Sequence, residues 1–98
     1  TWNGFFAEGY ELAPGYEAEA VLGLAHEAAT GGPLQSFMTA GYLDTRVYAL
    51  YDRIPALCYG PKTQNIHGID ERASISSIRR ITGTMALFIA DWCGVEAV

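Results

Sequence analysis

Between Ile54 and Ile75 the sequence changes from a short apolar run to a Gly-Pro stop, then to a polar loop, and then to the start of a helix. Residues 56–59 form a short apolar run, which predicts a buried strand. Gly60 and Pro61 end this strand, because glycine frees the backbone and proline cannot donate a ladder hydrogen bond. A polar loop that carries His67 follows, ahead of a helix. A strand that ends in a loop of ionisable groups before a helix is where open α/β sheets place their sites.

The spacing of apolar residues predicts three helices, at about 17–29, 45–52 and 74–93. Asp44 is placed to cap the second helix, and Ser74 begins the third. The stop signals are Gly31-Gly32-Pro33 after the first helix and Gly94 after the last.

The segments between these helices predict strands. Residues 5–12 are expected to form an edge strand, and residues 36–40 a second strand that runs parallel to 56–59 across a right-handed connection. A parallel sheet needs cover on both faces, and the helix at 74–93 supplies one cover. The fold class is therefore α/β, a short mixed or parallel sheet with packed helices. The apolar positions of that last helix are Ile75, Ile78, Ile81, Met85, Phe88, Ile89 and Trp92.

Composition limits the range of functions. The chain has 98 residues and can form at most one domain. Its net charge of −5 and its lack of a basic cluster argue against nucleic-acid binding. We identify no membrane span and no secretory signal, and a cytoplasmic location is expected. Cys58 and Cys93 are too few for a disulfide scaffold and are expected to pack in the core.

Half of the residues are hydrophobic, which is a large share for a chain of this size. Either the core is unusually dense, or one apolar face of the chain packs against another segment. The chain also starts at Thr1 rather than at a methionine. We therefore expect it to be a piece of a larger protein.

Single residues leave several roles open. His67 could bind a metal, act as a base or cap a helix, but a zinc site needs three or four ligands and the chain offers no second cluster at ligand spacing. His26 is interpreted as a surface residue or as a residue with a satisfied partner. Arg46 could hold a carboxylate through two hydrogen bonds or could be an ordinary charge on a helix surface.

Three short motifs, taken in order, resemble the C-terminal part of a known family of metallopeptidases. They are Tyr-Leu-Asp-Thr-Arg at 42–46, Ile-Pro-Ala-Leu-Cys-Tyr-Gly-Pro at 54–61 and Ile-His-Gly-Ile-Asp-Glu at 66–71. The family is that of the zinc-dependent aminoacylases and acetylornithine deacetylases, with the succinyl-diaminopimelate desuccinylases and carboxypeptidase G. The resemblance covers residues 36–94.

The resemblance implies a three-layer α/β/α zinc-exopeptidase-like catalytic domain interrupted by a lid or dimerisation domain. Residues 1–98 would be its C-terminal segment, with the lid and the N-terminal part absent. His67 matches a ligand of a two-zinc centre that is incomplete here, and the remaining ligands and the general base would lie elsewhere, so no catalytic residue is assigned to this chain. Arg46, in the Asp44-Thr45-Arg46 turn, and Gly60 match positions near the substrate.

The expected activity is hydrolysis of an amide bond in an N-acyl amino acid or small peptide, with the isolated chain inactive. The expected partners are this small-molecule substrate and the rest of the chain's own catalytic domain, without nucleic acid or membrane. A homo-oligomer is left open. The alternative is a non-catalytic binding or interaction module that uses the same half-fold.

Overall fold

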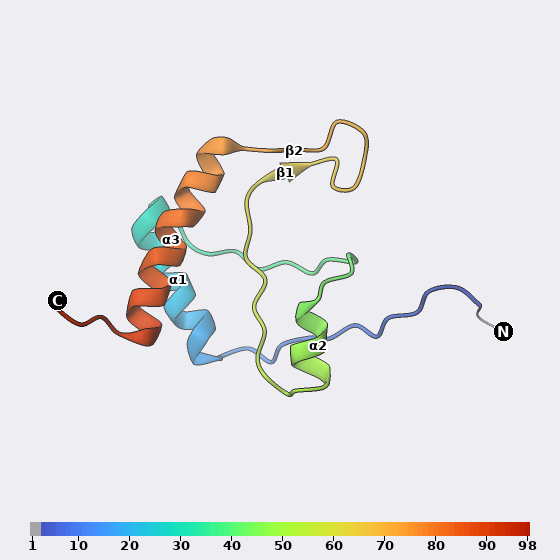
Figure 1. Cartoon of the computed structure of the whole chain (residues 1–98), viewed down its shortest axis with the longest axis horizontal. Helices are drawn as coiled ribbons and strands as arrows, with labels where there is room; N and C mark the ends of the chain where they lie inside the picture. The colour runs from blue at the N-terminus through green and yellow to red at the C-terminus, as the bar shows by residue number, and fades with distance from the viewer. Residues whose placement is uncertain (1–2) are drawn as a thin grey trace.

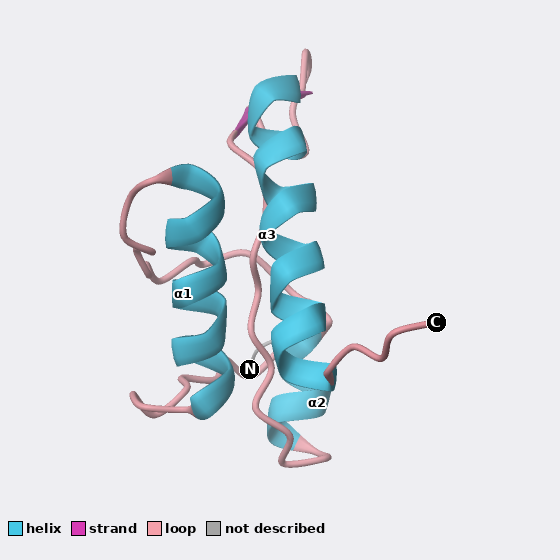
Figure 2. Ribbon diagram, turned by 90° about the vertical axis from the view of Figure 1, so that its left-hand side faces the viewer, coloured by secondary structure: helices cyan, strands magenta, loops and turns pink. Residues whose placement is uncertain are grey.

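Three helices and one two-stranded sheet make up the regular structure of residues 3–98, which are the residues that the computed structural model describes. Helix α1 and helix α3 lie side by side and run in opposite directions, whereas α2 lies apart from them (Figures 1 and 2). The chain is thus a small mixed α/β structure. The elements are α1 (Glu17–Thr30), α2 (Thr45–Leu50), β1 (Thr63–Gln64), β2 (Arg72–Ala73) and α3 (Ile75–Cys93).

The ends of α1 and α3 follow from local chemistry, and the predictions at 17–29 and 74–93 are confirmed. The Oγ of Ser74 accepts a hydrogen bond from the backbone N–H of Ser77 at 3.3 Å, which satisfies one free donor of the first turn of α3. Gly31 and Gly94 end the two helices with φ values of 78° and 79°, which glycine adopts without a steric penalty.

Helix α2 is shorter than the predicted span of 45–52, and its predicted cap is wrong. Asp44 occupies the N-cap position, but its side chain makes no capping hydrogen bond. Its backbone is already helical, with φ −64° and ψ −20°, whereas a capping side chain needs an extended backbone at that residue to reach the free N–H groups.

The core lies between α1 and α3. Leu22 and Ala25 are the buried apolar residues within 3–98, and Ser77 and Thr84 are the buried polar residues of α3, in contact with Lys62 and Tyr59. Gly83 faces α1, because a Cβ added there would lie 3.9 Å from the Cβ of Ala29. A glycine at this position therefore lies where α3 packs against a helix.

The predicted parallel sheet is wrong for this chain. Residues 5–12, 36–40 and 56–59 are not strands, because within residues 3–98 no neighbouring strand pairs with their backbone groups. The sheet is instead an antiparallel hairpin, in which Thr63 pairs with Ala73 and Gln64 with Arg72. A hairpin supplies both partner strands from one short segment, so it forms without help from distant residues.

Much apolar surface remains outside the core. The radius of gyration is 15.9 Å, whereas a compact domain of this length has about 13 Å. On α3, Ile75, Ile89 and Trp92 are 70%, 54% and 49% exposed, so most of the predicted apolar stripe has no cover. Cys58 and Cys93 are exposed as well, which corrects the expectation that both pack in the core.

Candidate functional site

His67 lies in the loop that joins β1 to β2, at one end of the molecule (Figure 1). The loop is a tight turn in which the N–H of Gly68 donates to the carbonyl of Asn65 at 2.8 Å. A Cβ on Gly68 would lie 3.1 Å from that same carbonyl oxygen, so a larger residue would shift the Asn65 carbonyl by a few tenths of an ångström.

The backbone of this loop is strained. Asn65, His67 and Asp70 have φ values of 53°, 61° and 60°, in the left-handed region that side chains other than glycine seldom adopt. Asparagine, aspartate and histidine adopt this region more often than other non-glycine residues do. A residue held in such a conformation costs on the order of 1–3 kcal/mol, and residues of this kind cluster at functional sites.

The side chain of His67 is exposed and has no hydrogen-bond partner within residues 3–98. Both ring nitrogens are therefore open to a ligand. No group of three or more histidine, cysteine, aspartate or glutamate side chains that could hold a metal ion occurs in the described part of the chain. Because a zinc site needs at least three protein ligands, these residues alone do not form one.

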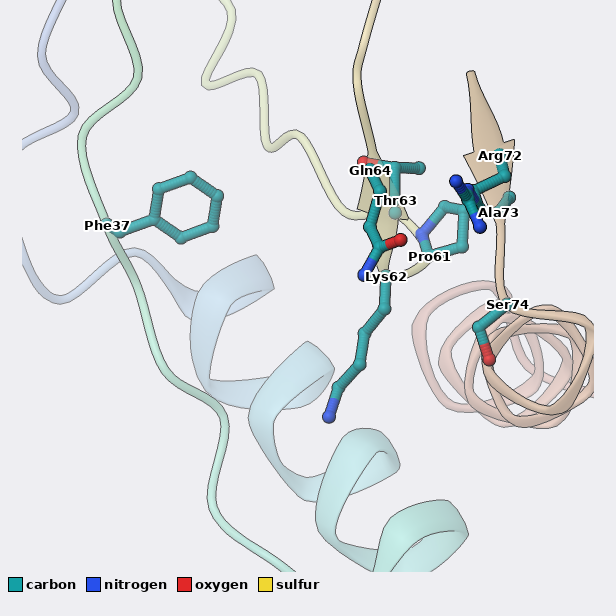
Figure 3. A pocket seen from close by; sticks show the side chains of 9 residues that line it. Phe37, Pro61, Lys62, Thr63, Gln64, Arg72, Ala73 and Ser74 are labelled. Carbon is teal, nitrogen blue, oxygen red and sulfur yellow. The ribbon is translucent and has the colours of Figure 1, made fainter. Parts of the chain in front are cut away.

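A second feature is an open cleft between the start of α3, the hairpin and the segment that carries Phe37 (Figure 3). Its volume is about 740 Å³. Gly60 lines the cleft, whereas His67 and Arg46 do not, and the predicted place of Gly60 near a substrate stays a prediction. The lining residues are Phe37, Gly60, Pro61, Lys62, Thr63, Gln64, Arg72, Ala73 and Ser74.

Backbone hydrogen bonds hold one side of this cleft against α3. The N–H of Lys62 donates to the Oγ of Ser77 at 2.9 Å, and the N–H of Ser74 donates to the carbonyl of Lys62 at 2.9 Å. Ser77 is buried, so the bond from Lys62 to Ser77 is partly shielded from water. Residue 62 is thereby fixed independently of its own side chain.

Arg46 contacts the N-terminal segment and two tyrosine rings, and its predicted role near a substrate stays a prediction. Its Nε donates to the carbonyl of Glu8 at 2.9 Å, and its guanidinium lies 5.7 Å and 5.9 Å from the ring centroids of Tyr42 and Tyr51. The hydroxyl of Tyr10 donates to Oγ1 of Thr45 at 2.7 Å. These contacts hold the N-terminal segment against α2, away from the cleft.

His26 has a satisfied partner, as predicted. Its Nδ1 lies 2.7 Å from the hydroxyl of Tyr59, the residue that precedes Gly60 in the sequence.

The sequence alone predicts no role for four residues that lie at or near the cleft: Tyr59, Lys62, Phe37 and Arg72. A signal was present for two of them, since Lys62 and Arg72 flank the loop and are two of only six basic residues in the chain.

A comparison with models of known protein families finds no match to this chain. Within residues 3–98, no helix combines the length and the hydropathy that crossing a lipid bilayer requires.

Proposed function

We propose that this chain is the C-terminal part of the catalytic domain of a zinc-dependent amidohydrolase of the aminoacylase and acetylornithine deacetylase type. His67 is the zinc ligand in this proposal. One observation supports it most. The His67 imidazole is exposed and has no hydrogen-bond partner within residues 3–98, and its backbone is in the left-handed region. His67 also lies in the motif at 66–71 that carries the resemblance.

The ion would be held by a neutral imidazole nitrogen of His67, which is a common zinc ligand. The described residues contribute one donor, so the proposal assigns the other ligands and the general base to chain outside these 98 residues. A bound zinc ion would polarise an amide carbonyl and lower the pKa of water. The substrate class is an N-acyl amino acid or small peptide, and the proposed location is the cytoplasm.

The proposal includes a three-layer α/β/α parent domain, in which α1 and α3 cover one face of a larger sheet. The exposed apolar side chains of α3 support it, because a row of this kind is stable only when another layer covers it. Ile75, Ile89 and Trp92 lie on this uncovered side. No strand pairs with the segment at 56–59 within residues 3–98, although the carbonyl of Ala56 accepts from the hydroxyl of Tyr10 at 3.2 Å. A neighbouring strand of the parent sheet would supply the remaining backbone hydrogen bonds.

The competing function is a non-catalytic interaction module. The same exposed face of α3 favours it, since large uncovered apolar patches mark interaction surfaces. The two functions differ in what they require of the complete gene. The hydrolase needs further histidine, aspartate and glutamate ligands encoded outside this stretch, and the module needs none.

The test is hydrolysis of N-acetyl amino acids by the protein expressed from the complete reading frame. We expect activity that a chelator removes and zinc restores, and a loss of at least about 100-fold in the variant His67→Ala. His26→Gln is the matched control, because it changes the other histidine of the chain and should keep the activity. A complete reading frame without further ligands, or full activity in His67→Ala, would overturn the proposal.

A further inference from the structure

The cleft beside the hairpin concentrates positive charge in an acidic chain. Lys62 and Arg72 both line it, although the chain has six basic residues and a net charge of −5. Neither aspartate nor glutamate is among the lining residues. In Figure 3 the side chains of both cations come from the hairpin or its base, on the side opposite Phe37.

Both cations lack a carboxylate partner within residues 3–98. Their backbones are fixed near each other, since Lys62 is bonded to Ser74 and Ser77, and Arg72 follows the antiparallel register with Gln64. Both side chains therefore add positive potential to the cleft, and this potential attracts an anion. The planar guanidinium of Arg72 can also donate two parallel hydrogen bonds to a carboxylate.

The opposite side of the cleft is apolar. The Phe37 ring is 87% exposed and points across the open space toward the hairpin (Figure 3). Pro61 and Ala73 add apolar surface on the hairpin side, beside the two cations (Figure 3). A Cβ on Gly60 would meet no atom within 4 Å, so a ligand can approach the backbone there. An exposed aromatic ring facing two unpaired cations suits a ligand with an anionic head and an apolar body.

We propose that this cleft is a binding site for a small organic carboxylate that carries an apolar or aromatic group. Its carboxylate contacts Lys62 and Arg72, and its apolar group packs on Phe37. The volume of about 740 Å³ lies in the usual range for small-molecule sites. This binding requires neither zinc nor His67 nor hydrolysis, so it goes beyond the proposed function and can succeed or fail separately from it.

The probe is 3-phenylpropionate, which contains no amide bond and cannot be hydrolysed. In an NMR titration of the 98-residue chain, we expect its addition to shift the backbone amide signals of Lys62, Thr63 and Arg72. The neutral 3-phenylpropionamide has the same size and should bind at least about 10-fold more weakly, because it lacks the charge. Equal binding of the two probes, or shifts confined to other parts of the chain, would overturn the proposal.

Variants separate the two halves of the site. Lys62→Met and Arg72→Met should each weaken 3-phenylpropionate binding about fivefold, whereas Arg79→Met, which removes an exposed cation outside the cleft, should not. Phe37→Ala should weaken the binding of 3-phenylpropionate but leave the binding of acetate unchanged.

A loss of 3-phenylpropionate affinity in Arg79→Met equal to that in Lys62→Met or Arg72→Met would show non-specific charge attraction. Inorganic phosphate binding as tightly as 3-phenylpropionate would show a bare-anion site. Either result would contradict an organic-carboxylate site.

Discussion

The Nδ1 atom of His26 lies 2.7 Å from the hydroxyl oxygen of Tyr59, and this contact joins α1 to the segment that leads into the cleft. The same hydroxyl donates to Oγ1 of Thr84 on α3 at 3.3 Å. Oγ1 of Thr84, which is fully buried, donates in turn to the carbonyl of Arg80 at 3.1 Å. Three parts of the chain that are distant in sequence thus meet at the hydroxyl of Tyr59, which is the residue before Gly60.

Tyr59→Phe should lower the free energy of unfolding by about 1 kcal/mol, because it removes the hydroxyl and leaves the groups of His26 and Thr84 without that partner. Urea denaturation followed by circular dichroism measures this change. Tyr48→Phe is the matched control, since the Tyr48 hydroxyl has no partner within residues 3–98. Equal unfolding midpoints for Tyr59→Phe and the wild type would show that the contact adds no stability.

Gly83→Ala should stabilise the chain by about 0.5–1 kcal/mol. A glycine inside a helix costs about 1 kcal/mol relative to alanine, and the added methyl group would meet Ala29 at an ordinary contact distance of 3.9 Å. The same substitution at Gly31 should destabilise the chain, because φ is +78° there. Thermal melts of the two variants are the measurement, and a lower midpoint for Gly83→Ala would mean that α1 and α3 pack more closely than described.

The sequence predicted the two long helices and their ends because their determinants are local. Ser74 bonds to Ser77 three residues away, and Gly31 and Gly94 set the backbone of the residue at which each helix stops. Strands are different, since each needs a partner elsewhere. The segments at 36–40 and 56–59 have apolar residues suited to strands, but no partner lies within residues 3–98.

The candidate site could be predicted only in part. The motif predicts Gly60 near a substrate, and the structure shows Gly60 at a cleft without testing what that cleft binds. The cleft depends on Phe37, which no short-range pattern links to Arg72, 35 positions later in the sequence. The β1–β2 hairpin had a local signal that was not used, namely the turn-forming Asn65 and Gly68 between two short extended pairs.

Arg46→Lys should release the N-terminal segment from α2. Lysine lacks the Nε donor that bonds to the carbonyl of Glu8, and its ammonium stacks less well on the rings of Tyr42 and Tyr51. Cleavage by a glutamate-specific protease after Glu8 should become about fivefold faster, as expected from a loss of about 1 kcal/mol of local stability.

Arg79→Lys is the control for this experiment, because Arg79 is an exposed residue of α3. Its cleavage rate should match that of the wild type. If Arg46→Lys is cut no faster than this control, the contacts of Arg46 do not hold the segment, and Arg46 becomes free for the substrate role that its motif suggests.

The 98-residue chain should bind a hydrophobic dye, because the apolar residues of α3 remain uncovered. Ile89→Gln should reduce the dye fluorescence, since Ile89 lies within the exposed row between Met85 and Trp92. Leu22→Gln would instead unfold the core and raise the fluorescence. Dye fluorescence at the level of buffer alone would show that this face is covered in solution.

The zinc content of His67→Ala, measured by elemental mass spectrometry on the protein expressed from the complete reading frame, tests the central claim most directly. We predict two zinc ions per chain in the wild type and in His26→Gln, and the loss of one ion in His67→Ala, because the remaining ligands no longer complete its coordination. An unchanged zinc content in His67→Ala would contradict the assignment of His67 as a metal ligand.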